Sequence, residues 1–215
     1  TTNDPAVLFR AMQYANELGM FFASHCEVPE LASPRAINGR DEQRLGIKGS
    51  PACAEEIIID RDIRLAHATG AHIHIQHVSS KLGMETIAWW KSRGDVKVTA
   101  EVSPHHLLFT DEHIGDYDTH YKMNPPLRTK ADNEGLLEGL IEGVFDLLLV
   151  ALGLVVMSSD MFITKPTLQY PHWLPLFIAN LWATGLMSLK VLQLCQRHQG
   201  LGVLPVLRRI QVMHV

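Results

Sequence analysis

Two histidines stand at the ends of apolar stretches in this 215-residue chain. His25 follows an apolar stretch over residues 20–24, and His77 lies near the end of a second one over residues 71–78. Neutral imidazole nitrogens bind zinc, and a hydrolytic zinc site also needs a carboxylate and an open position for water. If both stretches are parallel strands, the two imidazoles project from one sheet edge and could share a divalent cation. The alternative, that each is a hydrogen-bonded core histidine, stays open.

Two more histidines lie within the second stretch. His72 and His74 alternate with Ile73 and Ile75, so they share a face that is distinct from that of His77. We therefore predict that His72 and His74 are structural or surface residues.

Two further segments follow a third apolar stretch over residues 96–102. The neighbours His105 and His106 point in different directions, so at most one could reach a site, and the alternative is a loop that caps the sheet edge. The segment Asn124-Pro125-Pro126 predicts a rigid turn, because proline fixes φ and keeps the residue before it extended. An amide at such a turn could orient a ligand, although many Asn-Pro turns only redirect the chain.

Helical periodicity and turn residues predict the elements that must position these side chains. Asp4-Pro5 is typical of a helix start, and Asp132 could cap a later helix. Helices are expected over residues 5–18, 51–69, 82–93 and around 136–141, and strands over 20–24 (buried), 71–78 and 96–102. This alternation predicts an α/β fold, with a parallel sheet or barrel and a site at the carboxyl ends of the strands. Neither GxGxxG nor GxxxxGK[ST] occurs, so no phosphate-binding loop is expected.

Composition argues against several classes of protein. Nineteen Lys and Arg against 23 Asp and Glu give a net charge of −4, too mild for a nucleic-acid-binding surface. The three cysteines are far apart, which argues against a disulfide framework or a cysteine zinc site and fits a reducing cytoplasm. No signal peptide is visible, and because the chain begins without Met, we expect that upstream residues have been lost.

The charge changes abruptly near residue 146. Residues 1–146 hold 22 acidic and 14 basic side chains, a net of −8, whereas residues 147–215 hold one acidic and five basic side chains, a net of +4. Such asymmetry marks separate domains or segments of different origin. The apolar run over residues 147–157 is too short to span a bilayer, and polar residues interrupt the longer run over 173–189. We expect a mostly helical apolar tail, with a membrane-attached segment as the weaker alternative.

The motifs of residues 1–146 together resemble the dihydroorotase family, in the type I branch of the amidohydrolase superfamily. They are His25-Cys26-Glu27, GIKGSPACAEE over residues 46–56, QHVSS around His77, TAEVSPHHL over 99–107 and KMNPPLR over 122–128. Hydantoinases and allantoinases share less of this set.

The resemblance implies a (β/α)8 barrel with two zinc ions in the complete site. It also implies the interconversion of N-carbamoyl-L-aspartate and dihydroorotate, a cytoplasmic step of pyrimidine synthesis. His25 and His77 would be ligands of one zinc ion, and Asn124 would contact the substrate. A small-molecule substrate is then the expected partner, with no nucleic acid and no membrane, and a homo-oligomer stays open.

The sequence also departs from the family pattern. The family's HxH pair lies upstream of Thr1, and its strand-end aspartate is replaced near Ala151, with Val155 in place of a histidine. Asp160 lacks the matching context, so the catalytic acid/base is unknown. We expect an incomplete dihydroorotase-like barrel segment over 1–146, joined to a divergent tail over 147–215, for example by a frameshift. The alternatives are a catalytically inactive binding or scaffold domain, or a cyclic amidohydrolase of the hydantoinase or allantoinase type.

Overall fold

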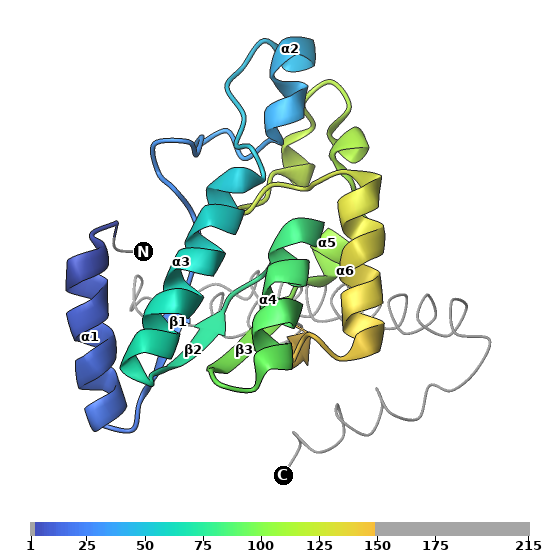
Figure 1. The fold of residues 1–215 in the computed structure, drawn as a ribbon. Coiled ribbons are helices and arrows are strands. Elements are labelled where there is room, and N and C mark those ends of the chain that lie inside the picture. Colours follow the sequence, from blue (N-terminus) through green and yellow to red (C-terminus); the bar gives the residue numbers. More distant parts are fainter. Residues whose placement is uncertain (1–2, 149–215) are drawn as a thin grey trace, which may run out of the picture. The chain divides into compact units, whose positions relative to one another are not determined.

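The computed structural model describes residues 3–148, and residues 1–147 form one compact unit. Helices and strands alternate along this unit, as Figure 1 shows. The helices are α1 (Pro5–Glu17), α2 (Glu42–Leu45), α3 (Cys53–Thr69), α4 (Lys81–Arg93), α5 (Pro104–Leu108) and α6 (Lys130–Glu142). The strands are β1 (Phe21–Ser24), β2 (His72–Ile75), β3 (Lys97–Val102) and β4 (Leu147–Leu148). The predicted α/β class with a parallel sheet is confirmed.

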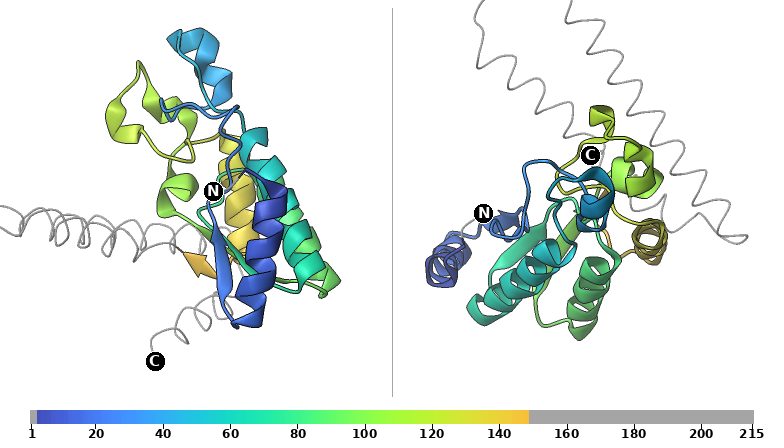
Figure 2. Two further views of the ribbon diagram at one scale, coloured as in Figure 1. Left: turned by 90° about the vertical axis from the view of Figure 1, so that its left-hand side faces the viewer. Right: turned by 90° about the horizontal axis from the view of Figure 1, so that it is seen from above.

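The strands form one sheet in the order β1-β2-β3-β4. β1 and β3 both pair with β2 in parallel, so that Ala23, His74 and Thr99 lie side by side across three strands. Helices α1, α3, α4 and α6 stand in a row along one face of this sheet (Figures 1 and 2). The carboxyl ends of β1 and β2 therefore open at the same edge, as the strand–helix alternation predicts.

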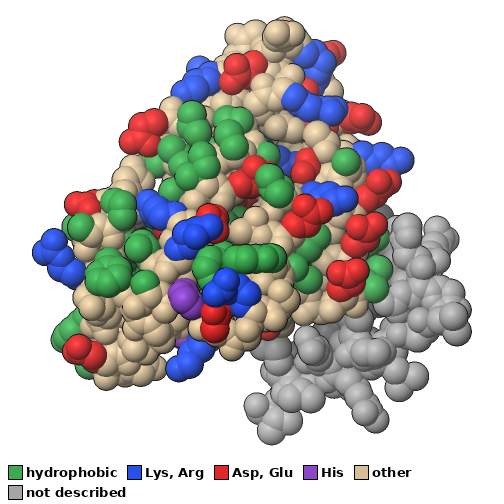
Figure 3. Space-filling view, in the orientation of Figure 1, with side chains coloured by type: hydrophobic (Ala, Val, Ile, Leu, Met, Phe, Trp, Pro, Cys, Tyr) green, Lys and Arg blue, Asp and Glu red, His purple; other side chains and the backbone are tan. Residues whose placement is uncertain are grey.

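Apolar side chains fill the space between the sheet and the helices. Ile73 and Ile75 of β2 are fully buried, and so are Ile59 and Ile63 of α3 and Ile87 of α4. Each such side chain contributes about 1.5–3 kcal/mol through its burial. The outer surface of the helices carries charges of both signs with apolar side chains between them (Figure 3). The apolar layer between the sheet and the helices holds the strands whose ends form the sheet edge.

Helix ends follow local sequence signals, with one correction. The Asp4 carboxylate accepts hydrogen bonds from two backbone amides of α1, as predicted. The predicted cap Asp132 is wrong: the hydroxyl of Thr129 caps α6, and Asp132 reaches back to the backbone N–H of Thr129 from the third helical position. The two residues form a capping box, in which each side chain satisfies a backbone donor of the other residue.

The predicted strand over residues 20–24 is confirmed as β1, but the prediction that it is buried is wrong. Met20 and Phe21 are 59% and 60% exposed, and only Ser24 of β1 is buried. β1 is the first strand of the described sheet and pairs only with β2 among residues 3–148. Its outer edge and the side chain of Phe21 therefore lack a neighbouring strand in this part of the chain.

Two other expectations concern the loops and the tail. Residues 104–108 form the short helix α5 rather than the loop considered as an alternative, and Ser103 caps this helix by accepting from the backbone N–H of His106. None of the helices within residues 3–148 is long and apolar enough to cross a membrane. The apolar tail and the run over 173–189 lie outside the described residues, so they stay predictions, as does the domain division at 146/147.

Candidate metal centre at the carboxyl ends of β1 and β2

The structure brings His25 and His77 together at the predicted sheet edge. His25 directly follows β1, and His77 lies two residues beyond β2. Their nearest ring nitrogens, His25 Nδ1 and His77 Nε2, are 3.0 Å apart, and the rings meet edge to face with centroids 4.8 Å apart. Two imidazoles that are 52 positions apart in sequence therefore converge on one point.

The environment of His77 keeps its imidazole neutral. Burial and, to a lesser extent, the neighbouring His25 lower the pKa of His77 to about 4. Its Nδ1 atom is buried and has no hydrogen-bond partner among the described residues. A neutral imidazole is suited to binding a metal ion, because protonation competes with ligation, and the His77 nitrogen that meets His25 is Nε2.

The backbone of His77 adopts an unusual conformation. Its φ is +35°, in a region that residues other than glycine rarely occupy. Glu101 of β3 holds this segment at two points: its carboxylate accepts from the His77 N–H at 3.3 Å, and its carbonyl accepts from the Val78 N–H at 2.9 Å. A strained conformation persists where neighbouring contacts enforce it. Glu101 thus helps to define where the His77 ring points.

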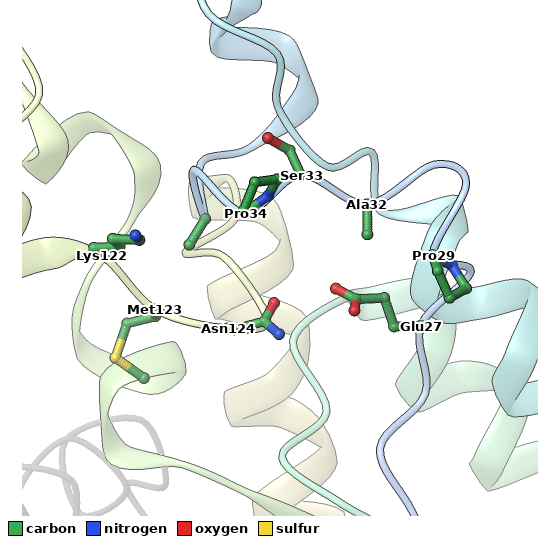
Figure 4. A pocket seen from close by; sticks show the side chains of 9 residues that line it. Glu27, Pro29, Ala32, Ser33, Pro34, Lys122, Met123 and Asn124 are labelled. Atoms are coloured by element: carbon green, nitrogen blue, oxygen red, sulfur yellow. The ribbon is translucent and has the colours of Figure 1, made fainter. Parts of the chain in front are cut away.

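Asn124 lies beside this histidine pair. Its amide nitrogen is 3.4 Å from His25 Nε2, and the carboxylate of Glu27 is 3.8 Å from the same atom. Asn124 and Glu27 face each other across a cavity of about 510 Å³, which Figure 4 shows. The cavity is further lined by Pro29, Ala32, Ser33, Pro34, Ala36, Lys122 and Met123. The predicted site residues His25, His77 and Asn124 therefore occupy one region.

Buried polar contacts tie the Asn124 turn to the loop after β2. Arg128 is 4% exposed and donates to the Ser79 hydroxyl at 3.1 Å and to the Ser50 carbonyl at 2.6 Å. The Glu55 carboxylate accepts from both the backbone N–H and the hydroxyl of Ser79. Burial raises the pKa of Glu55, and the charge of Arg128 opposes that shift. The motifs contain these residues, but spacing gives no sign that they contact each other.

The adjacent histidines of α5 do not join the pair. His106 is buried between the Ser103 hydroxyl and the Pro125 carbonyl, at 2.8 and 3.0 Å, and burial lowers its pKa to about 3. It thereby supports the turn that carries Asn124. His105 packs its ring against Phe109. The expectation that the two point in different directions agrees with these contacts.

The described residues supply part of a metal site. Two imidazole nitrogens about 3 Å apart fit the separation of neighbouring ligands around zinc, which binds imidazole at about 2.0–2.1 Å. Within residues 3–148, however, no three His, Cys, Asp or Glu side chains gather closely enough to hold a metal ion. The positions of Ala151, Val155 and Asp160 lie outside the described residues. The histidine pair thus fits two of the roughly three protein ligands of a catalytic zinc.

The sequence is similar to those of known enzymes over this same region. Residues 3–83 match a family model described as dihydro-orotase-like. The chain is 46% identical to a dihydroorotase of Carboxydothermus hydrogenoformans over 146 residues, which are 67% of this chain and 34% of that protein. It is 47% identical to a dihydroorotase of Desulforapulum autotrophicum over 141 residues, or 65% and 33% of the two chains.

Solved structures match over about the same two thirds of this chain. A D-hydantoinase from a Thermus species matches with a TM-score of 0.58 and 25% identity, over 67% of this chain and 33% of that one. Another D-hydantoinase structure matches with a TM-score of 0.59 and 26% identity, over 69% and 34%. The chain therefore spans about a third of the length of the relatives it matches.

Proposed function

We propose that this chain, whose first two thirds are homologous to dihydroorotases, carries part of the metal centre and substrate pocket of a zinc-dependent cyclic amidohydrolase. The reaction is the interconversion of N-carbamoyl-L-aspartate and dihydroorotate. The observation that carries the proposal is the convergence of His25 and His77 at 3.0 Å, with Asn124 beside them.

Each residue has a defined role in this proposal. His25 and His77 hold the zinc ion through neutral imidazoles. A bound zinc ion supplies a water of lowered pKa and polarises the ring amide carbonyl. Asn124, fixed by its proline turn, orients the substrate through its amide, which faces the cavity (Figure 4). The proton-transferring carboxylate is not assigned within residues 3–148, because the expected position falls near Ala151.

The proposal extends to the whole chain. Residues 1–146 form part of a (β/α)8 barrel, supported by the likeness to hydantoinase structures. Two zinc ions would occupy the complete site, and the protein would be cytoplasmic. Higher identity to dihydroorotases than to hydantoinases favours dihydroorotate over other cyclic amides as the substrate.

A catalytically inactive binding domain is the second candidate. It is favoured by one observation: the described residues contain two convergent ligands and no group of three. Such a domain would bind zinc and the small-molecule ligand without turnover.

One assay separates the two candidates. The full-length chain is loaded with zinc, and both dihydroorotate hydrolysis and ligand binding are measured. Turnover that falls at least about 100-fold in His77→Ala, with unchanged turnover in the exposed control His120→Ala, supports the enzyme. Zinc and ligand binding without turnover supports the inactive domain. Absence of zinc binding in the folded chain contradicts both.

A further inference from the structure

We propose that Glu101 is a positioning residue, which holds the backbone of His77 in place and stands at the end of a row of polar side chains formed by His72, Thr99 and His74. The inference rests on the proposed function, because the role of Glu101 depends on His77 being a ligand. It assigns a purpose to polar side chains that the sequence marks only as structural or surface positions.

This row of polar side chains lies on the sheet face opposite the helices. Residues of a strand alternate between the two faces, and Ile73 and Ile75 are buried on the helix side. His72 and His74 therefore share the other face with Thr99 and Glu101 of the adjacent β3. The parallel register places His74 directly beside Thr99. The side chains of His74 and Glu101 are only 11% and 5% exposed.

Continuous contacts join these side chains. The Thr99 hydroxyl lies 3.1 Å from His72 Nε2 and 2.9 Å from His74 Nδ1. His74 Nε2 is 3.4 Å from one carboxylate oxygen of Glu101, and the other carboxylate oxygen accepts from the His77 N–H. The row of polar side chains therefore runs from His72 along the sheet to the backbone of His77, the proposed metal ligand.

One arrangement of protons satisfies every group with neutral rings. An ionised Glu101 only accepts, so His74 must carry its proton on Nε2 and present Nδ1 as an acceptor. Thr99 then donates its single hydroxyl proton to His74 Nδ1 and accepts from His72 Nε2–H. All donors point toward Glu101, and the carboxylate in turn receives the His77 N–H. Such charge-directed chains are rigid because every member has one role.

The location of this row of polar side chains, which ends at His77, indicates a functional role. Burying polar groups is costly unless all are paired, and apolar side chains commonly fill the interior of strand–helix barrels. Here this partly buried row of polar side chains ends at a histidine with φ of +35°, whose Nε2 meets His25. Carboxylates behind metal-binding histidines orient the ligand and tune its affinity. Glu101 performs this task through the backbone and not through the ring.

The test uses the metal-free full-length chain and histidine tautomers measured by long-range ¹H–¹⁵N NMR at pH 8. The wild type is expected to show His74 protonated on Nε2. In Glu101→Gln the amide N–H donates to His74, so the proton moves to Nδ1 and the chain reverses. Thr99→Val, which cuts the chain beyond His74, leaves the proton on Nε2. A His74 that is doubly protonated, or whose tautomer is the same in wild type and Glu101→Gln, overturns the inference.

Zinc affinity provides the second readout. Glu101→Ala is expected to weaken zinc binding by about 10–100-fold with secondary structure retained, and Glu101→Gln to recover most of it, because its carbonyl still accepts from the His77 N–H. The exposed Glu85→Ala on α4 serves as the matched control and keeps wild-type affinity. Equal affinity in Glu101→Ala and Glu85→Ala overturns the positioning role. A zinc affinity that is insensitive to His25→Ala and His77→Ala contradicts the proposed function instead, whereas the tautomer result stands apart from it.

Discussion

Ile73 and His74 are neighbours in β2, yet their side chains are held in opposite ways. Ile73 is fully buried on the face that α3 and α4 cover, where many individually weak apolar contacts together hold its side chain. His74, on the other face, depends on single contacts with Thr99 and Glu101. When one apolar contact is lost, the neighbouring apolar contacts still hold the side chain. When one polar partner is lost, a buried polar group is left without a hydrogen-bond partner. Both kinds of contact therefore contribute to stability, and the polar contacts also set the geometry of the site.

The largest effect is expected where a buried charge loses its partner. Arg128→Ala removes the donors to Ser79 and Ser50 and leaves buried Glu55 without a compensating charge. The free energy of unfolding should fall by about 3–5 kcal/mol, because an unpaired buried charge is costly. Urea unfolding followed by circular dichroism measures this. The matched control is Arg93→Ala, an exposed arginine of α4, and an equal loss in both variants would contradict the comparison.

A slightly smaller effect is expected in the apolar layer. Ile73→Ala leaves a cavity under α3 and α4 and should lower the free energy of unfolding by about 2–4 kcal/mol, and Ile73→Val by about 1 kcal/mol. Zinc affinity of the folded Ile73→Ala chain should stay at the wild-type value. A large loss of zinc affinity would show that the two faces of β2 are not separate in function.

Acid should destabilise the polar region through His106. Its folded pKa of about 3 lies below the ordinary value of 6.5, so the unfolded chain binds the proton more readily between these values. The contribution of His106 to stability is complete above pH 6.5 and decreases as pH falls. Between pH 7 and 5 it should decrease by about 2 kcal/mol. His106→Gln, compared with wild type at both pH values, should remove this part of the pH dependence; an unchanged slope would contradict the assignment.

The smallest effect is expected at the exposed strand. Phe21→Ser in β1 should change the free energy of unfolding by less than about 0.5 kcal/mol, because its side chain is 60% exposed. Solubility should rise, since the variant removes apolar surface beside an edge that is unpaired within residues 3–148. A loss as large as that of Ile73→Ala would indicate that a partner covers Phe21 in solution.

Local features of this fold are predictable from sequence, whereas features that depend on strand neighbours are not. The Asp4 cap, the helix spans and the shared edge of His25 and His77 follow from periodicity and turn residues. The exposure of Phe21 does not, because it depends on whether a second strand pairs with β1. Local signals can also compete, as Thr129 and Asp132 do at the start of α6.

Glu101 illustrates why part of the site escapes sequence reasoning. Its contact with His77 spans 24 positions and depends on the register of β2 and β3. The available signal is a carboxylate at an alternating position of an otherwise apolar strand end, on the face that carries Thr99. The same holds for Arg128, whose partners lie 49 and 78 positions away.

Zinc binding to the full-length chain tests the central claim most directly, with competition against a chromophoric chelator as the measurement. We predict that His25→Ala and His77→Ala each abolish binding or weaken it at least about 100-fold, because each removes one of two convergent ligands. His120→Ala, at an exposed imidazole outside the site, should bind zinc as the wild type does. Wild-type affinity in both His25→Ala and His77→Ala would contradict the assignment of this sheet edge as the metal centre.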